Sequence, residues 1–256
     1  MVRRPLGRTG LSISPIALGT TKLGRNTDVK YPFPFALPSD REVAALLDCA
    51  RAAGVNLIDT APAYGESERR LGRLIKGYRH EVVLCTKCGE RYADGLSSYD
   101  FSARAIIASA EQSLRNLRTE YVDILLLHSD GRDLEILTQT DALSGLTRLK
   151  ETGKIRAAGI SAKTIDGVLE ACHALEVVMA PFSQEETALA EALGEAHLRG
   201  MGVLAIKGLQ SGYLQAGRAI DFVLCRPFID ALVVGTINPK HLAEAVAAAE
   251  RVRGAV

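Results

Sequence analysis

Short apolar runs alternate with amphipathic segments along most of the chain. The runs are rich in leucine and β-branched residues, which is typical of parallel strands buried on both faces. We predict strands at Ile13–Leu18, Val55–Asp59, Val82–Lys87, Val122–His128, Ile155–Ser161, Val177–Phe182, Gly202–Lys207 and Ala231–Gly235.

The segments between the runs carry apolar residues at helical spacing. The stretch SDREVAALLDCARAAG predicts a helix capped by Ser39 at its start and by Gly54 at its end. The stretch SARAIIASAEQSLRNLR has the same amphipathic pattern. A last helix is expected over NPKHLAEAVAAAERVRG, where a capping Asn precedes a Pro in the first turn.

Eight strand–helix alternations in 256 residues predict an α/β protein with a (β/α)8 TIM barrel as a single domain, residues 1–256. The alternative is an open doubly wound sheet, which usually has a glycine-rich phosphate turn after its first strand. Here the first strand is followed by GTTKLG, which matches neither GxGxxG nor a P-loop. The long loop GRNTDVKYPFPFALPSD is then expected over the carboxyl-terminal face, where barrel enzymes have their active sites.

Polar side chains stand at the ends of three successive predicted strands. Asp59 ends the second strand and Tyr64 follows it, while Lys87 ends the third strand and His128 ends the fourth. In a barrel these strand ends meet at one mouth, and alternation along the strands turns Lys87 and His128 inward. A buried lysine needs a counter-ion, and Asp59 on the neighbouring strand is the nearest candidate.

These four residues suggest a site that gives a proton to an oxygen atom. An unperturbed tyrosine has a pKa near roughly 10, and a nearby ammonium lowers that pKa by favouring the phenolate. Asp59 would keep Lys87 charged, and His128 would bind a carbonyl oxygen or relay its proton. Singly, each residue has a plainer interpretation as a turn acid, a packing tyrosine or a satisfied core histidine. Their convergence is what favours an oxyanion site.

The ordered set of segments resembles the aldo-keto reductase superfamily over nearly the whole chain. PLGRTGLSISPIALGT resembles the short N-terminal β-hairpin and first strand of that family, and NLIDTAPAYGESE resembles its Asp–Tyr segment. CTKCG and LLLHSDG resemble its lysine and histidine strands, and GKIRAAGIS and NPKHLAEA its fifth strand and last helix. Any one piece is weak evidence, whereas the complete order is specific.

The resemblance implies a barrel that binds a nicotinamide cofactor without a Rossmann motif. It implies hydride transfer to an aldehyde or ketone, or from an alcohol, with Tyr64 as general acid or base. Asp59 and Lys87 would tune Tyr64, and His128 would position the carbonyl. The cofactor-binding positions carried over from the family are Thr20, Thr21, Asp59, Ser161, Lys207, Gly208, Leu209, Ser211, Gly235, Thr236, Asn238, Lys240, His241 and Glu244.

The chain departs from the family pattern at the cofactor positions. Ser161 is retained from the pair that holds the nicotinamide amide, but Ala162 replaces the family's Asn and Met179 its Gln. The family's Lys and Arg for the ribose 2′-phosphate fall at Gly235 and His241. Backbone amides at the helix N-terminus can still hold a phosphate. The resemblance to the family therefore favours NADP(H), and NAD(H) is possible.

Two lysines near these positions have open roles. Lys207 stands where the family has a tyrosine that stacks on the nicotinamide ring, so it would touch the cofactor or the carbonyl site. Equally, it can be a strand-end lysine that extends to solvent. Lys240 would supply charge to a phosphate or simply be solvated on the helix surface.

Composition excludes several other classes. The net charge of +1 argues against a nucleic-acid partner. MVRRPLGRTGLS lacks the apolar core of a signal peptide and no run reaches transmembrane length, so we expect a cytoplasmic protein without a membrane partner. The five cysteines form no disulfide framework, and the histidines show no zinc spacing, so no metal is expected.

Substrate identity is weakly encoded, beyond a small carbonyl or alcohol. Tyr31, Phe33 and Phe35 in the first loop, with Arg91 and Tyr92 in the third, are candidates for lining a substrate pocket. The alternative is an ordered, proline-stiffened loop that packs on the barrel. Oligomeric state and reaction direction are not indicated.

Two other functions stay open. The chain could be a catalytically slow nicotinamide-binding sensor or partner subunit, although the four-residue constellation favours an enzyme. Cys85 and Cys88 form a CxxC, which can be a redox pair in a reducing compartment. Residues three apart on a strand point to opposite faces, so we expect Cys85 to pack inside the barrel and Cys88 to lie in the loop.

Overall fold

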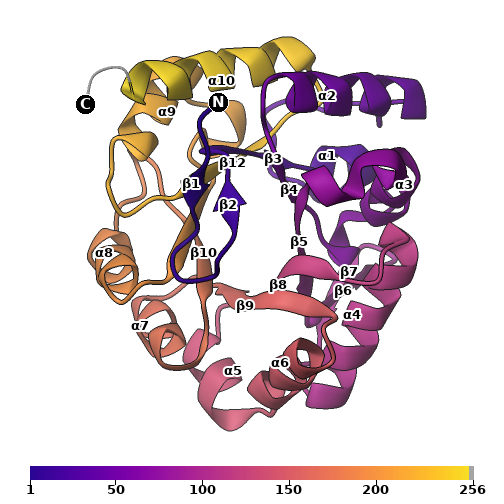
Figure 1. Ribbon diagram of the computed structural model, residues 1–256, viewed down its shortest axis with the longest axis vertical. Coiled ribbons are helices and arrows are strands. Elements are labelled where there is room, and N and C mark those ends of the chain that lie inside the picture. Colours follow the sequence, from indigo (N-terminus) through magenta and orange to yellow (C-terminus); the bar gives the residue numbers. More distant parts are fainter. Residues whose placement is uncertain (254–256) are drawn as a thin grey trace.

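The computed structural model describes residues 1–253 and contains a closed barrel of parallel strands (Figure 1). The barrel strands are β3 (Ile16–Gly19), β4 (Leu57–Asp59), β5 (Val83–Cys88), β8 (Val122–His128), β9 (Ile155–Ser161), β10 (Val177–Pro181), β11 (Gly202–Ile206) and β12 (Ala231–Gly235). They follow one another around the barrel in chain order, and β12 closes against β3. The predicted (β/α)8 class is confirmed.

Helices form an outer ring around the strands (Figure 1). They are α1 (Thr21–Gly24), α2 (Asp40–Ala52), α3 (Ser67–Leu74), α4 (Ala103–Leu117), α5 (Asp133–Gln139), α6 (Ala142–Glu151), α7 (Ile165–Ala174), α8 (Ala190–Leu198), α9 (Ala216–Leu224) and α10 (Pro239–Arg253), with 3-10 turns η1 (Pro62–Tyr64), η2 (Lys76–Glu81) and η3 (Gln210–Gly212). The predicted last helix extended to residue 254, which lies outside the described residues. Within residues 1–253, no helix combines the length and apolarity needed to cross a membrane.

Capping explains where α2 starts. Ser39 accepts a hydrogen bond from the Glu42 amide while the Glu42 carboxylate accepts one from the Ser39 amide, which is a complete capping box. The predicted cap is therefore confirmed. At the other end the helix stops at Ala52, and Gly54 follows with a φ of +77°, a left-handed conformation that glycine adopts without strain.

The first predicted strand, Ile13–Leu18, is wrong as a single element. The chain breaks between β2 (Ser12–Ile13), which pairs antiparallel with β1 (Arg4–Pro5), and β3. Pro15 has no N–H to donate to a sheet ladder, so the strand cannot run through it. Its carbonyl still accepts from the Leu232 amide at 2.9 Å, and the ladder of the barrel starts there.

Apolar side chains form two core layers, one inside the barrel and one between the barrel and the helices. Along β5, Val83 and Cys85 belong to the inner layer, and Leu84 and Cys88 to the outer one. Cys85 therefore packs inside the barrel as predicted. The prediction that Cys88 lies in a loop is wrong, because β5 continues through it and its thiol is buried.

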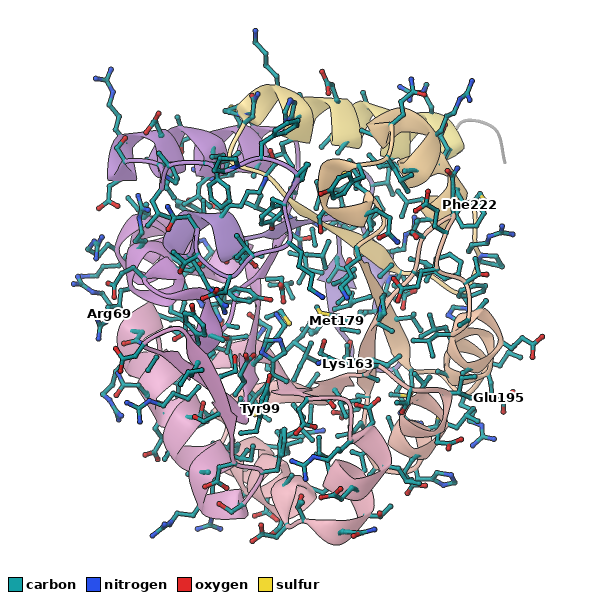
Figure 2. All side chains as sticks on the ribbon, turned by 180° about the vertical axis from the view of Figure 1, so that it is seen from behind. Arg69, Tyr99, Lys163, Met179, Glu195 and Phe222 are labelled. Atoms are coloured by element: carbon teal, nitrogen blue, oxygen red, sulfur yellow. The ribbon has the colours of Figure 1, made fainter. Side chains whose placement is uncertain are left out.

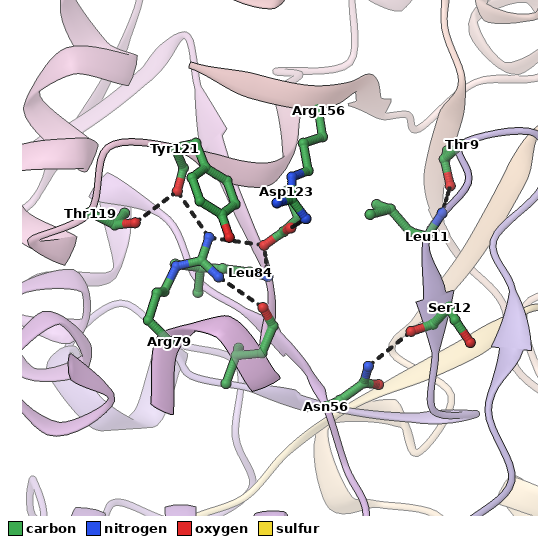
Figure 3. Close-up of polar contacts among 11 residues, drawn as sticks. Thr9, Leu11, Ser12, Asn56, Arg79, Leu84, Thr119, Tyr121, Asp123 and Arg156 are labelled. Carbon is green, nitrogen blue, oxygen red and sulfur yellow. Dashed lines mark hydrogen bonds and ion pairs between the residues drawn. The ribbon is translucent and has the colours of Figure 1, made fainter. Parts of the chain in front are cut away.

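The β1–β2 hairpin lies across the amino-terminal end of the barrel (Figure 1). The Arg8 amide donates to the Gly200 carbonyl at 2.8 Å, and the Asn56 side chain donates to the Ser12 carbonyl at 2.9 Å (Figure 3). A Cβ atom at Gly7 would lie 2.3 Å from the Gly202 nitrogen, so only glycine permits this approach. The hairpin closes the end opposite to the carboxyl ends of the strands.

A buried carboxylate also stabilises the amino-terminal end. Asp123, at the start of β8, is 1% exposed and accepts hydrogen bonds from Arg79, Arg156 and the Leu84 amide, each at 2.9 Å (Figure 3). Arg79 donates further to the Tyr121 carbonyl. Each charged group there has partners within the fold.

Candidate active site

The predicted ion pair at the mouth is present. Asp59 ends β4, and Lys87 lies one residue before the end of β5. The Lys87 ammonium lies 2.5 Å from Asp59 Oδ1 and donates to the Thr60 carbonyl at 2.9 Å. Both side chains are almost fully buried. Burial lowers the pKa of Lys87, but Asp59 and Tyr64 raise it more, so the lysine is charged.

Tyr64 lies against this pair at the end of η1. The Lys87 Nζ atom lies 4.9 Å from the centre of the Tyr64 ring. Burial raises the pKa of Tyr64 and the Asp59 charge adds to it, while Lys87 and Thr21 lower it, and the net direction is upward. The ammonium therefore lowers the pKa of Tyr64 as expected, but burial raises that pKa more. Tyr64 keeps its proton at neutral pH and is a hydrogen-bond donor.

His128 completes the predicted set of four. The rings of Tyr64 and His128 meet edge to face, with centres 6.2 Å apart and planes at 88°. Ser161 is the ladder partner of His128 on β9, so the two side chains project on the same face. The four predicted catalytic side chains thus lie together at the carboxyl-terminal mouth.

Glu90 is a site residue that the sequence pattern did not predict. It begins β6 (Glu90–Ala93), which pairs with β7 (Leu96–Tyr99) in a hairpin directly after β5. Its Oε2 atom lies 2.6 Å from His128 Nδ1. The sequence signal was the turn Asp94-Gly95, with φ of +52° and +80°, because an Asp-Gly pair between short strands indicates a tight hairpin.

Ser161 is the part of the predicted amide clamp that is present. Its hydroxyl is nearly buried and forms no hydrogen bond within the described residues. Its neighbours Ala162 and Met179 are buried and apolar, and Met179 is seen near the centre of the barrel in Figure 2. A cofactor amide would therefore find a single free hydroxyl on this side.

The predicted cofactor loop after β11 has an unusual backbone. Lys207, Gln210 and Ser211 have φ of +58°, +46° and +60°, a left-handed conformation that is strained for these residue types. Gly208 packs against Leu232, where a Cβ atom would lie 2.7 Å from Leu232 Cδ1. Such strain clusters at functional sites. The exposed Lys207 has no ion pair within residues 1–253.

The predicted cofactor positions after β12 lie at the start of α10. Thr236 accepts the Asn238 amide at 3.0 Å, and Asn238 accepts the Lys240 amide at 2.9 Å, so these side chains shape the turn. Exposed side chains follow at Lys240, His241 and Glu244, and Gly235 is exposed at the end of β12. Leu209, also predicted, is half-buried beside η3.

The two predicted threonines have different surroundings. Thr20 is fully buried, donates to the Asp59 carbonyl at 2.8 Å and accepts from Ser67 at 2.8 Å. Its hydroxyl is therefore engaged in holding β3 and β4 together. Thr21 begins α1 and contacts the Tyr64 hydroxyl, whose pKa it lowers.

Tyr31 is the first-loop residue that reaches the mouth. Lys22 lies 3.8 Å above the centre of its ring, and a Cβ atom at Gly235 would lie 3.3 Å from its hydroxyl. Burial, together with Tyr64, raises the pKa of Tyr31 to about 12. Phe33, by contrast, is 78% exposed.

The first and third loops are joined to each other. The Arg25 guanidinium stacks 3.4 Å from the centre of the Tyr92 ring, and the Tyr92 hydroxyl donates to Asp28. Arg91, on the same hairpin, is exposed. Of the predicted substrate residues, Tyr31 and Tyr92 are therefore held by neighbours, and Phe33 and Arg91 are free to meet solvent.

The CxxC thiols lack the features of a redox pair. Cys85 and Cys88 are both fully buried and lie in different core layers. Burial raises the pKa of both thiols, so they stay protonated and poorly nucleophilic. The geometry speaks against the thiol oxidoreductase alternative.

Comparisons with known proteins agree on one family. The profile of the Aldo/keto reductase family matches residues 15–222. A solved structure from Pseudomonas aeruginosa, described as an aldo-keto reductase, superposes with a TM-score of 0.91 at 42% identity over 98% of this chain and 95% of that one. An aldo-keto reductase from Bacillus halodurans, 21% identical, shares the fold with a TM-score of 0.84.

Curated relatives include dehydrogenases and reductases. L-galactose dehydrogenase of Arabidopsis thaliana is 32% identical over 233 residues, which cover 82% of this chain and 66% of that protein. The NADH-specific methylglyoxal reductase of Escherichia coli is 29% identical over 245 residues, 87% of this chain and 72% of that protein. The chain spans between about half and two thirds of the length of the first curated relatives it matches.

Proposed function

The chain belongs to the aldo/keto reductase family, and on this premise we propose that it interconverts an aldehyde or ketone and the corresponding alcohol with a nicotinamide cofactor. The observation that carries the proposal is the position of the Lys87 ammonium. It lies between a carboxylate, Asp59, and a phenol, Tyr64, at the mouth of the barrel. A buried ion pair in contact with a weak acid is an arrangement that supports proton transfer.

In this mechanism Tyr64 is the general acid for reduction and the general base for oxidation. A bound nicotinamide would supply the hydride for reduction or accept it in oxidation. Because the pKa of Tyr64 is raised, the phenol keeps its proton until negative charge develops on the substrate oxygen. Lys87 then stabilises the phenolate, and Asp59 holds Lys87 in place. His128, whose ring contacts that of Tyr64, would bind the same substrate oxygen.

Other residues around the mouth fit a nicotinamide. The free, nearly buried hydroxyl of Ser161 faces the same way as His128 and can bind a carboxamide. The turn around Thr236 and Asn238 and the start of α10 offer backbone amides for a phosphate. NADP(H) is favoured by family habit, and NAD(H) is the alternative, since Gly235 and His241 supply no strong positive charge.

Titration with NADPH and with NADH tests the cofactor proposal first. The chain has no tryptophan, so energy transfer from tyrosine and the shift of nicotinamide emission report binding. We expect binding of at least one cofactor, and tighter binding of NADPH would place the 2′-phosphate near Thr236, Lys240 or His241. Failure of both to bind would contradict the proposed function.

Replacement of Tyr64 by Phe tests the chemistry. We expect Tyr64→Phe to lower turnover by roughly 10²- to 10⁴-fold, the usual contribution of a general acid, with cofactor affinity unchanged. The measurement is kcat with a carbonyl found by screening, together with the cofactor titration.

Tyr121→Phe is the matched control, because this tyrosine packs against Arg79 and Arg156 at the other end of the barrel. The kcat of Tyr121→Phe should equal that of the wild type. If the kcat of Tyr64→Phe were also unchanged, Tyr64 would not be the proton donor and the mechanism would be wrong.

A further inference from the structure

Glu90, which lies against His128, has no part in the mechanism above. Nδ1 of His128 is buried, and its close polar neighbour is Glu90 Oε2 at 2.6 Å, an ion-pair distance, although the ring is not turned for a linear hydrogen bond. The Glu90 side chain is 9% exposed. A buried carboxylate is thus placed against one specific nitrogen of the histidine that faces the substrate.

The Glu90 carboxylate is fixed and ionised. Its Oε1 atom accepts a hydrogen bond from the Ser97 hydroxyl at 2.6 Å across the hairpin, and the Tyr99 hydroxyl lies at 3.4 Å. Burial raises the pKa of Glu90, but His128, Ser97 and Arg25 lower it further, to about 2. At any working pH the two carboxylate oxygens of Glu90 accept hydrogen bonds and donate none.

An ionised carboxylate beside Nδ1 determines the tautomer of the ring. A neutral imidazole has one N–H, and the carboxylate favours that N–H on Nδ1. Nε2 then carries a lone pair when the ring is neutral, and a proton only when the ring is charged. Nε2 forms no hydrogen bond within the described residues, so it is the nitrogen left for a ligand.

We propose that Glu90 is a positioning residue that makes His128 bind a carbonyl substrate as imidazolium. The proposal rests on the proposed function, since it concerns how the same site binds its carbonyl substrate. A carbonyl oxygen can only accept a hydrogen bond and needs Nε2–H. The neutral ring presents a lone pair at Nε2 and cannot donate to that oxygen. Proton transfer itself stays with Tyr64.

The surroundings of His128 set the pH at which its ring gains or loses the second proton. Burial lowers the pKa of His128 and Lys87 adds to that, while Glu90 and Asp59 raise it; Tyr64 meets the ring as a neutral phenol. The net pKa lies below the ordinary value of about 6.5. The imidazolium is therefore lost as the pH rises through that lowered pKa, and affinity for a carbonyl is lost with it.

Glu90→Gln separates charge from shape. A Gln amide can donate to Nδ1, which allows a neutral ring to carry its proton on Nε2. The variant should then bind a carbonyl above the His128 pKa as well as below it. Glu90→Asp keeps the carboxylate and should keep the wild-type behaviour. Asp94→Asn is the matched control, because it neutralises an exposed carboxylate at the tip of the same hairpin, where Asn tolerates the positive φ.

The first experiment needs no substrate. Long-range ¹H–¹⁵N correlation spectra of the free protein distinguish Nδ1–H from Nε2–H, and the His128 signals are assigned by their loss in His128→Asn. We expect the neutral ring to carry Nδ1–H in the wild type, Glu90→Asp and Asp94→Asn, and Nε2–H to be populated in Glu90→Gln. Neutral His128 of the wild type found as Nε2–H would overturn the proposal.

The second experiment is the pH profile of kcat/KM for carbonyl reduction. We expect the wild type and Asp94→Asn to lose about tenfold per pH unit above the His128 pKa, as for one essential proton. Glu90→Gln should lose less than about twofold over the same range. An unchanged slope in a folded Glu90→Gln would overturn the proposal. A wild type without activity on any carbonyl would refute the proposed function, while the tautomer measurement would still test the pair.

Discussion

The two ends of the barrel each bury an aspartate in an ion pair, and the two pairs differ in what surrounds them. Asp123, at the amino-terminal end, accepts from two guanidinium groups and a backbone amide. Asp59, at the mouth, has one side-chain cation, Lys87, at 2.5 Å. That cation in turn lies against Tyr64. Burial is similar, at 1% and 3% exposed, so burial does not distinguish them.

A tyrosine lies beside each pair, and the difference is which groups surround that tyrosine. Tyr121 packs against two arginines, whereas Tyr64 lies beside a lysine and a histidine. Arginine does not titrate in proteins, so the cations of the Asp123 cluster keep one charge state. Lys87 contacts a phenol whose charge state it influences, and the next ring, His128, is another titratable group. A buried ion pair therefore indicates stability at one end of this barrel and proton chemistry at the other.

Breaking the pair at the mouth should have the largest effect. Lys87→Met removes the charge that stabilises the Tyr64 phenolate and leaves Asp59 buried without its cation. We expect turnover to fall by at least about 10²-fold. We also expect the free energy of unfolding to fall by about 3–5 kcal/mol, the usual result of removing one partner of a buried pair. Urea denaturation and kcat measure the two effects.

The double variant Asp59→Asn/Lys87→Met separates stability from activity. It leaves no unpaired charge, so it should recover most of the lost stability while turnover stays low. Recovery of turnover along with stability would show that the pair only supports the fold, which would make the two ends of the barrel equivalent.

Breaking the pair at the other end should affect stability alone. Asp123→Ala leaves Arg79, which is largely buried, without its carboxylate, while Arg156 is half exposed and can turn to water. We expect a loss of about 3 kcal/mol in unfolding free energy, at the lower end for a broken buried pair. The kcat of the protein that remains folded should equal that of the wild type. A reduced kcat with normal stability would mean that the amino-terminal end is coupled to the mouth.

Much of this comparison was predictable from the sequence, because the mouth follows from strand periodicity. Apolar runs that end in Asp59, Lys87 and His128 place those side chains at one end of a parallel barrel, whatever the details of the loops. The Asp123 cluster was not predicted, because strand periodicity does not identify the partners of a charged residue inside an apolar run. Its partners Arg79 and Arg156 come from a 3-10 turn and from a neighbouring strand.

The features that the sequence did not predict depend on backbone geometry. The first strand was extended through Pro15, although a missing N–H ends a ladder there. Glu90 was overlooked because it follows a strand end and reaches His128 only when the Asp94-Gly95 turn folds back. The sign of the Tyr64 pKa shift was also wrong, because the opposing effect of burial cannot be weighed before the depth of the side chain is known.

The smallest expected effect lies on the cofactor side of the mouth. Ser161→Ala removes a free hydroxyl that stands beside His128, and the hydrogen bond it would give a nicotinamide amide contributes about 0.5–1.5 kcal/mol. Cofactor affinity should therefore weaken by about two- to tenfold in the fluorescence titration, with unfolding free energy unchanged. Ser113→Ala, which removes a buried hydroxyl from α4, is the control and should leave affinity unaltered. Unaltered affinity in Ser161→Ala would show that Ser161, the last polar side chain of the predicted amide clamp, does not hold the cofactor. The cofactor would then be held by backbone amides and by the loop after β11. In that case side chains would carry out catalysis at the mouth, and the backbone would bind the cofactor.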